Sequence, residues 1–195
     1  PKPREKRGIF NHDHRKITVV DSEFAFIGGM NIAREYEDEW HDVHSKVEGG
    51  AVLELQALFY DRWKAAGGEA DIPTHDPRLD ALTYAPGRLD VDVVTTLPGL
   101  KTDIKKRYLK EINSSQDRIL IECAYFLDDT IIGALKQKVE QGTKAVVIVP
   151  NDPKHDVKLV RDGFSWVQND VVRSGIELYK YRGPMVHSKV AVFDG

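Results

Sequence analysis

The sequence predicts an α/β fold in two lobes, and three observations lead to this expectation. Hydrophobic residues make up 41% of the 195 residues, which is enough for a packed core. From residue 89 onward, short β-branched runs alternate with segments of helical periodicity, which is typical of strands joined by helical crossovers in a mainly parallel or mixed sheet. A short motif of the form His-x-Lys-x4-Asp also occurs near both ends of the chain.

The first lobe is expected within residues 1–70. Residues 16–20 and 24–28 read as two strands around a tight polar turn, which predicts a β-hairpin. A further strand is expected over residues 41–49. Residues 51–66 carry apolar side chains at helical spacing, and Gly67-Gly68 ends this predicted helix.

A linker is expected over residues 71–88, because this stretch holds several prolines and little periodicity. The second lobe is expected over residues 89–195. Its predicted strands cover residues 89–96, 118–126, 144–150, 176–181 and 185–193, and its predicted helices cover residues 102–115, 128–142 and 156–175. The two lobes are unequal around their shared motif, so we interpret the chain as a fragment that is truncated after the second motif.

Charge and cysteine content narrow the classes of function. The net charge of −3 and the pI near 6.2 argue against a general nucleic-acid binder, which usually has a basic face. Cys123 stands alone in an apolar run and is expected to pack as a small hydrophobic residue. No stretch reaches the roughly 18 apolar residues of a membrane span.

The two motifs carry the chemistry. The first holds His14, Lys16 and Asp21, and the second holds His187, Lys189 and Asp194. Side chains two residues apart on a strand share a face, so each His and its Lys should project together. Lysine offers a compact positive charge to anionic oxygens, and histidine can attack as a nucleophile or move a proton near neutral pH. The pairing therefore suits a substrate that carries a phosphate.

Two copies of the motif suit a reaction in two steps. One histidine would attack phosphorus while the other protonates the departing oxygen, which gives a phosphohistidine intermediate. The two lysines would spread positive charge over the phosphate oxygens, and the carboxylates would orient the imidazoles or balance their charge. No metal ion or other cofactor is required by this scheme.

The motifs resemble the paired HKD motifs of the phospholipase D superfamily. The first extends to the form H-x-K-x4-D-x6-G-[GS]-x-N, with Gly28, Gly29 and Asn31 in register. The flanking sequences "FIGGMNIAREY", "WHDVH", "AYFLDD" and "MVHSKVAVFDG" are similar to those of bacterial cardiolipin synthases. The resemblance implies a phosphatidyltransferase that uses phosphatidylglycerol, and two pseudo-twofold-related lobes.

We expect His14 to be the nucleophile and His187 to be the general acid and then the base, although the symmetry of the motifs allows the reverse. Phosphate oxygens are expected to bind Lys16, Lys189 and Asn31. The resemblance and the sequence also indicate residues that could border the site: Gly29, His41, Asp42 and Tyr125. One departure from cardiolipin synthases is Asp128, where those proteins usually have proline.

Several alternatives stay open. A phosphodiesterase of the same superfamily could hydrolyse phospholipid or nucleic acid, and a non-catalytic lobe could serve for binding. The closely spaced histidines at 12–14 and 41–44 invite a metal site, but no third cluster with ligand spacing accompanies them. A membrane surface is an expected partner, which favours a peripheral or anchored location on the cytoplasmic side. The aromatic residues of the helices are expected in the core: Phe59, Trp63, Phe164 and Trp166.

Overall fold

The computed structural model describes residues 13–69, 89–97, 101–151 and 156–195. The chain divides into two compact units: residues 1–27 with 45–102, and residues 28–44 with 103–195. The predicted linker at 71–88 lies outside the described residues. The lobe boundaries expected from the sequence, 1–70 and 89–195, stay predictions.

The first unit is built on a three-stranded sheet in the order β1-β2-β4. Strands β1 (Ile17–Val20) and β2 (Phe24–Gly28) form the predicted antiparallel hairpin, and β4 spans His44–Glu48. The turn residues Asp21 and Ser22 have φ angles of 52° and 60°. A polar residue such as Asp tolerates this left-handed region, so the tight turn is favourable for this sequence.

Helix α2 (Ala51–Ala65) packs against this sheet. Val52 and Leu55 are almost completely buried, together with Ala25 of β2. The helix ends where Gly67 adopts a φ of 92°, as the sequence predicted from the Gly-Gly pair. Beyond it, β5 (Thr96–Leu97) and β6 (Lys101–Thr102) form a short antiparallel pair.

The second unit contains a four-stranded mixed sheet in the order β11-β7-β8-β9. Its strands are β7 (Arg118–Cys123), β8 (Lys144–Pro150), β9 (Glu177–Tyr181) and β11 (Lys189–Phe193). The pairs β7–β8 and β8–β9 are parallel, whereas β11 runs antiparallel to β7. The α/β class is therefore confirmed, and the strand that follows the second histidine is the antiparallel member of the sheet.

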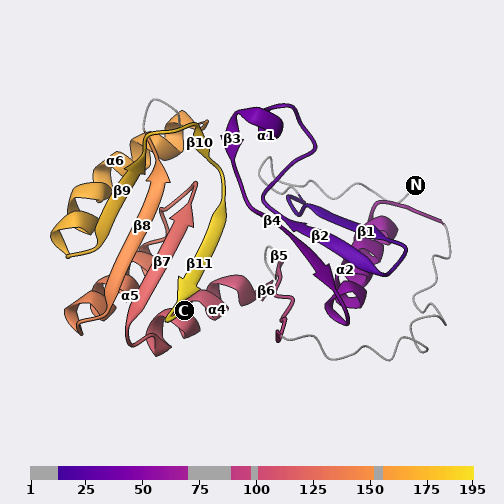
Figure 1. The fold of residues 1–195 in the computed structure, drawn as a ribbon, viewed down its shortest axis with the longest axis horizontal. Helices are drawn as coiled ribbons and strands as arrows, with labels where there is room; N and C mark the ends of the chain where they lie inside the picture. The colour runs from indigo at the N-terminus through magenta and orange to yellow at the C-terminus, as the bar shows by residue number, and fades with distance from the viewer. Residues whose placement is uncertain (1–12, 70–88, 98–100, 152–155) are drawn as a thin grey trace. The chain divides into compact units, whose positions relative to one another are not determined.

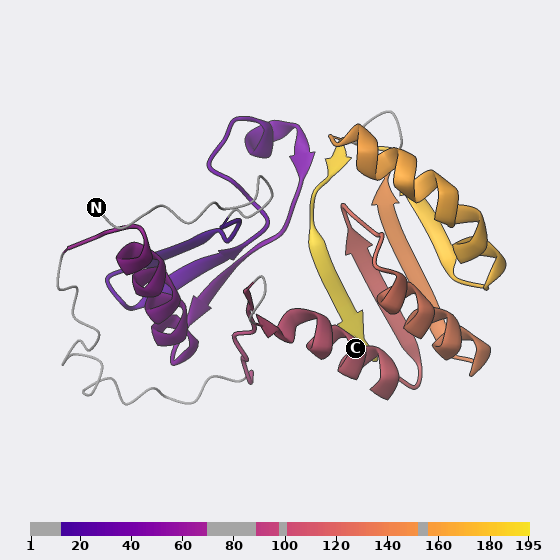
Figure 2. The ribbon, with the colours of Figure 1, turned by 180° about the vertical axis from the view of Figure 1, so that it is seen from behind.

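Three helices cover one face of this sheet: α4 (Asp103–Ser114), α5 (Asp129–Glu140) and α6 (Lys158–Arg173). All three lie in front of the strands in Figure 2 and behind them in Figure 1. Their buried side chains, including Ile112, Leu135 and Val171, form one core with Ile119 and Val147 of the sheet. Asp128 begins α5 because its carboxylate accepts hydrogen bonds from the Thr130 and Ile131 N–H groups, a role that proline cannot fill.

Residues 28–44 belong to this second unit although they follow the first motif in sequence. They contain the short helix α1 (Glu35–Asp38) and β3 (Trp40–His41), which pairs in parallel with β10 (Met185–Val186). The predicted strand over 185–193 is therefore interrupted at His187 and Ser188. The extended motif is divided in the same way, because Gly29 and Asn31 lie with the second histidine.

Corresponding residues of the two motifs differ in whether they face a helix or solvent. Ile17 and Val19 of β1 pack toward α2. Their counterparts in β11 are Val190 and Val192, and Val192 is 41% exposed on the sheet face that the three helices do not cover. Corresponding positions of the two motifs therefore have different surroundings in the two units.

Two expectations about the elements are wrong. The strand predicted over 89–96 is absent from residues 90–95, and only Thr96 of that range is in a strand. Of the aromatic residues expected in the core, Phe164 is buried, but Phe59 is 46%, Trp63 42% and Trp166 86% exposed. Helical spacing identifies which residues share a face but not which face meets the core.

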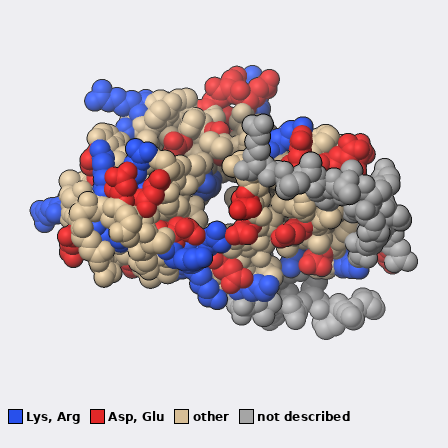
Figure 3. Space-filling model, turned by 60° about the horizontal axis from the view of Figure 1, so that its bottom comes forward, with Lys and Arg blue, Asp and Glu red and all other residues tan. Residues whose placement is uncertain are grey.

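Basic and acidic side chains are intermixed on the face of the molecule shown in Figure 3. This distribution agrees with the slightly negative net charge of −3. Within the described part of the chain, no helix has the length and apolar character needed to cross a bilayer.

Candidate active site

His187 is held in a nearly buried position beside Asp42. The side chains of His187 and Asp42 are 5% and 2% exposed, and Nδ1 of the imidazole lies 2.8 Å from Oδ2 of the carboxylate. The parallel pairing of β3 with β10 brings these residues together, because the His187 N–H group also donates to the His41 carbonyl at 2.7 Å. A segment far away in the sequence thus supplies the carboxylate.

The contact with Asp42 orients the ring. The carboxylate can only accept, so its contact with Nδ1 favours a proton on that nitrogen. The Lys189 ammonium lies 2.9 Å from Nδ1 and 3.1 Å from Nε2, and it also donates to the His187 carbonyl. A reactive ring nitrogen and a positive charge are therefore side by side, as phosphate chemistry needs.

Three aromatic rings surround the His187 imidazole. Trp40 lies at a centroid distance of 5.2 Å and a tilt of 39°, whereas Tyr36 and Tyr125 meet it edge-on at 5.5 and 6.3 Å. We call His187, Lys189, Asp42 and these three aromatic residues the His187 cluster. Such a wall limits the orientations of the ring and reduces the access of water to it.

Asn31 joins the cluster through Tyr36. Its Nδ2 donates to the Tyr36 hydroxyl at 2.8 Å, and that hydroxyl lies 3.4 Å from Nδ1 of His187. Burial raises the pKa of Tyr36, so this phenol stays neutral at physiological pH. The amide of Asn31 has a second N–H, which could donate a hydrogen bond to a phosphate oxygen.

Tyr125 connects the cluster to the start of α6. Its hydroxyl donates to Oδ2 of Asp156 at 2.7 Å, and the Lys189 ammonium lies 5.7 Å from the centre of its ring. Burial, followed by the neighbouring Asp156 carboxylate, raises the pKa of Tyr125 well above its ordinary value. The phenol is therefore a stable donor to Asp156, two residues before α6.

Gly29 allows Asp42 to reach the histidine. A Cβ atom at this position would overlap the Asp42 carboxylate, so only glycine leaves room for it. The glycine that the sequence pattern requires thus has a steric reason within the cluster.

Glu122 of β7 contacts β3 and the residues between β10 and β11. Its Oε1 accepts hydrogen bonds from the Ser188 hydroxyl and from Nε2 of His41 at 2.9 Å. Ser188 is fully buried between His187 and Lys189. The carboxylate therefore helps to fix the backbone that carries both functional side chains.

The first motif forms a similar pair in the other unit. The Lys16 ammonium lies 2.8 Å from Nδ1 of His14 and donates to the His14 carbonyl at 2.7 Å. His14 is exposed and precedes β1. Next to it, Arg15 forms an ion pair with Asp13, and the hydrogen bond from Arg15 lowers the pKa of this carboxyl.

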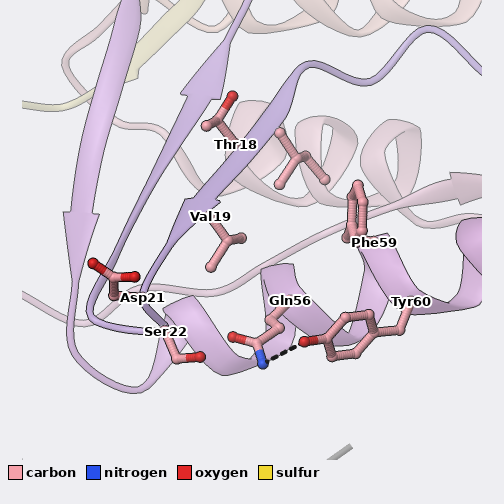
Figure 4. Close-up of a pocket in the computed structure, with 8 residues that line it drawn as sticks. Thr18, Val19, Asp21, Ser22, Gln56, Phe59 and Tyr60 are labelled. Atoms are coloured by element: carbon pink, nitrogen blue, oxygen red, sulfur yellow. Dashed lines mark hydrogen bonds between the residues drawn. The ribbon is translucent and has the colours of Figure 1, made fainter. Parts of the chain in front are cut away.

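Asp21 lies at the opposite end of β1 from His14, in the hairpin turn. Figure 4 shows Asp21 and Ser22 at one side of an open pocket of about 340 Å³ between β1 and α2. On the other side of this pocket, Gln56 donates to the Tyr60 hydroxyl at 3.0 Å. The pocket is lined along β1 from Ile17 to the turn, and His14 is not among its lining residues.

Asp194 likewise lies at the end of β11 that is distant from His187. Its carboxylate accepts hydrogen bonds from the backbone N–H groups of Gln116 at 2.7 Å and of Asp117 and Arg118 at 2.9 Å. These bonds, with the one from Gln116 first, lower the pKa of Asp194. The carboxylate that contacts the imidazole is Asp42, and Asp194 holds the turn between α4 and β7.

Sequence reasoning missed Tyr36, Trp40, Glu122 and Asp156 as members or supports of the cluster. Trp40 stands directly before the His-Asp pair at 41–42, so its position could have suggested it. Tyr36, Glu122 and Asp156 are recognised only from their contacts in the folded unit. For metals, the described residues contain no group of three or more His, Cys, Asp or Glu side chains that could hold an ion.

Comparisons with known proteins agree with the motifs. Residues 108–195 match the family model described as "Cardiolipin synthase, PLD-like domain". The chain is 30% identical over 202 residues to a probable cardiolipin synthase of Bacillus subtilis, and 31% identical over 190 residues to a cardiolipin synthase of Alkalihalophilus pseudofirmus. These alignments cover 97% and 93% of this chain, but only 40% and 37% of the relatives.

Among solved structures, Nuc from Salmonella typhimurium, a phospholipase D family member, matches with a TM-score of 0.41 and 20% identity. The match covers 47% of this chain and 58% of that protein. The sequence matches themselves confirm the resemblance to the phospholipase D superfamily. Within that superfamily, the resemblance is to bacterial cardiolipin synthases.

Proposed function

We propose that this chain is the catalytic part of a phosphatidyltransferase that makes cardiolipin from phosphatidylglycerol. The observation that supports this most directly is the repeated His–Lys contact, at 2.8 Å in the first motif and 2.9 Å in the second. The similarity to cardiolipin synthases gives the substrate class. Because the chain spans about 40% of the length of these relatives, the activity of the whole protein is part of the proposal.

In the first step, Nε2 of His14 attacks the phosphorus of phosphatidylglycerol. An N–P bond forms, the P–O bond to the terminal glycerol breaks, and the departing oxygen takes a proton from the His187 imidazolium. Asp42 suits this acid role, because a carboxylate at Nδ1 stabilises the positive charge of the ring. The mechanism requires that both imidazoles reach one phosphorus atom.

In the second step, neutral His187 removes a proton from a hydroxyl of a second phosphatidylglycerol. The resulting oxygen attacks phosphorus, the N–P bond breaks, and the products are cardiolipin and free His14. Lys16, Lys189 and Asn31 are proposed to bind the phosphate oxygens in both transition states. Asp21 and Asp194 are proposed to affect the reaction only by fixing the backbone of their motifs.

The location that suits this reaction is the cytoplasmic side of the cell membrane, with peripheral contact or with an anchor in another part of the protein. The two-lobe arrangement with a linker at 71–88 belongs to the same proposal.

The test uses phosphatidylglycerol that is radiolabelled in its phosphate. We expect cardiolipin and glycerol as products, and label that stays on the protein after denaturation. His14→Ala should abolish the label on the protein, and His187→Ala should abolish turnover.

Other products would point to the alternatives. Phosphatidic acid without cardiolipin would indicate a hydrolase, and cleavage of added DNA would indicate a nuclease. Normal turnover in both histidine variants would refute the catalytic assignment.

A further inference from the structure

The outer face of α6 exposes two large apolar side chains. Leu159 is 82% and Trp166 is 86% exposed, and they lie seven residues apart, which is about two helical turns or 10.5 Å on the same face. The opposite face of α6 already buries Phe164 and Val171 in the core. The helix thus exposes two large apolar side chains on a face that also carries Asp162 and Asp170 and that the core of this unit does not use.

Further apolar side chains extend this face toward the beginning of the helix. Val157 is 38% and Leu127 36% exposed, and Leu127 lies within 3.8 Å of the position that a Cβ on Gly163 would take. We call Leu127, Val157, Leu159 and Trp166 the α6 apolar surface. It is convex, since it is the outside of a helix, and therefore suits a broad fluid layer better than an inserted peptide.

The α6 apolar surface begins next to the His187 cluster. Asp156, which directly precedes Val157, accepts the hydrogen bond from Tyr125, whose ring contacts His187. Figures 1 and 2 both show α6 beginning at the end of the sheet where β10 lies, beside the C-terminal ends of β7 and β8. The apolar side chains therefore border the place where a phosphate would bind.

Charges around this surface favour an anionic partner. Lys158 and Arg173 are exposed on α6, at its two ends. Three carboxylates lie along this segment: Asp162 pairs with Arg161 at 2.7 Å, Asp170 pairs with Lys136, and Asp156 accepts the hydrogen bond from Tyr125. Exposed basic side chains at both ends of the helix, beside Trp and Leu, suit an anionic bilayer surface.

We propose that the α6 apolar surface docks this unit on an anionic phospholipid bilayer, with Trp166 and Leu159 inserted at the headgroup level. The choice of a bilayer rests on the proposed lipid substrate. A lipid whose phosphate must reach His187 keeps its acyl chains in the membrane, so the protein surface beside the histidine has to meet the bilayer. Tryptophan is well suited to this depth because its ring is apolar and its N–H is polar.

Co-sedimentation with vesicles tests the proposal on the 195-residue chain. Vesicles that contain phosphatidylglycerol should bind the protein at low ionic strength, and phosphatidylcholine vesicles should bind it less. The double variant Leu159→Ser/Trp166→Ser should lose at least about tenfold in partition coefficient, because it removes the two largest exposed apolar groups of the surface.

The matched control is Phe59→Ser/Trp63→Ser on α2, which removes an exposed aromatic pair from the other unit. It should bind vesicles like the wild type. Lipids brominated in their acyl chains should quench Trp fluorescence in the wild type and in Trp63→Phe but much less in Trp166→Phe. Equal unfolding midpoints of all variants would show that the substitutions leave the fold intact.

Two results would overturn the proposal. One is vesicle binding that is absent or is unchanged in the α6 double variant. The other is self-association of the wild type that this variant abolishes, which would mean that a second copy covers the surface. Failure of the proposed function looks different: vesicle binding would persist in wild type and in His187→Ala, but no phosphatidyl transfer would occur even with a short-chain, water-soluble phosphatidylglycerol.

Discussion

Replacing Asp42 by Asn tests whether the buried carboxylate controls the His187 imidazole. The substitution keeps the shape of the side chain but removes its charge and one of its two acceptor oxygens. Asp42 and His187 are 2% and 5% exposed, and their contact at 2.8 Å has little competition from water. We expect the ring to lose its preference for the proton on Nδ1.

The magnitude follows from the strength of this contact. A hydrogen bond to a charged group contributes about 1.5–3 kcal/mol, and about 1.4 kcal/mol corresponds to a factor of ten in rate. Phosphatidyl transfer by Asp42→Asn should therefore show a kcat that is about 10- to 100-fold lower. KM should change little, since the carboxylate does not contact the lipid in the proposed mechanism.

The direct assay is NMR of the imidazole nitrogens, because the shifts of protonated and unprotonated ring nitrogens differ widely. The wild type should show a protonated Nδ1, and Asp42→Asn, which lacks the charged acceptor, should show a smaller fraction of that form. Asp162→Asn, which removes an exposed carboxylate from α6, is the control and should leave the spectrum unchanged. Identical ring-nitrogen shifts in wild type and Asp42→Asn would refute the reasoning.

Three further predictions concern the supports of the fold and cluster. Gly29→Ala should displace the Asp42 carboxylate and lower kcat at least as much as Asp42→Asn, which turnover measurements would show; normal turnover would contradict the steric argument. The backbone N–H groups lower the pKa of Asp194 in the folded protein, so its stabilising effect is present above the ordinary Asp pKa of about 3.9 and is lost as pH falls through the lowered value. Asp194→Asn should therefore lower the thermal midpoint at neutral pH and less so in acid, and an equal loss at all pH values would exclude this linkage. Leu135→Ala, at a fully buried position, should cost about 2–5 kcal/mol in denaturant unfolding, whereas Val192→Ala on the uncovered sheet face should cost about 1 kcal/mol or less; similar costs would contradict the assigned faces.

Local sequence signals predicted most elements correctly. The hairpin, α2 and the alternation of strands and helices from residue 102 onward follow from β-branched runs, helical spacing and glycines at helix ends, which act over a few residues. The prediction of a strand over 89–96 was wrong, because a strand needs a partner. Within residues 89–97, Thr96 and Leu97 are the residues that pair with another strand, β6. The exposed position of Trp166 was also not predictable, since the periodicity of α6 does not say which face meets the sheet.

In the candidate site, too, some features follow from local sequence and others depend on the tertiary structure. The identities of His187 and Lys189 and their common side follow from the repeated motif, because two residues of spacing fix their mutual geometry. The carboxylate partner of His187 does not follow from the motif. The spacing of the motif indicated Asp194, whereas the pairing of β3 with β10 brings Asp42 to the ring.

The sequence by itself thus determined the α/β class, the two His–Lys pairs and the resemblance to cardiolipin synthases, since each is written in residues that are close together in the chain. Only the tertiary structure decided which carboxylate holds His187, why Gly29 must lack a side chain, and which face of α6 stays exposed. These depend on contacts between segments that are separated in the sequence, by 145 residues in the case of Asp42 and His187. Such contacts arise from strand pairing and core packing, which no short stretch of sequence encodes.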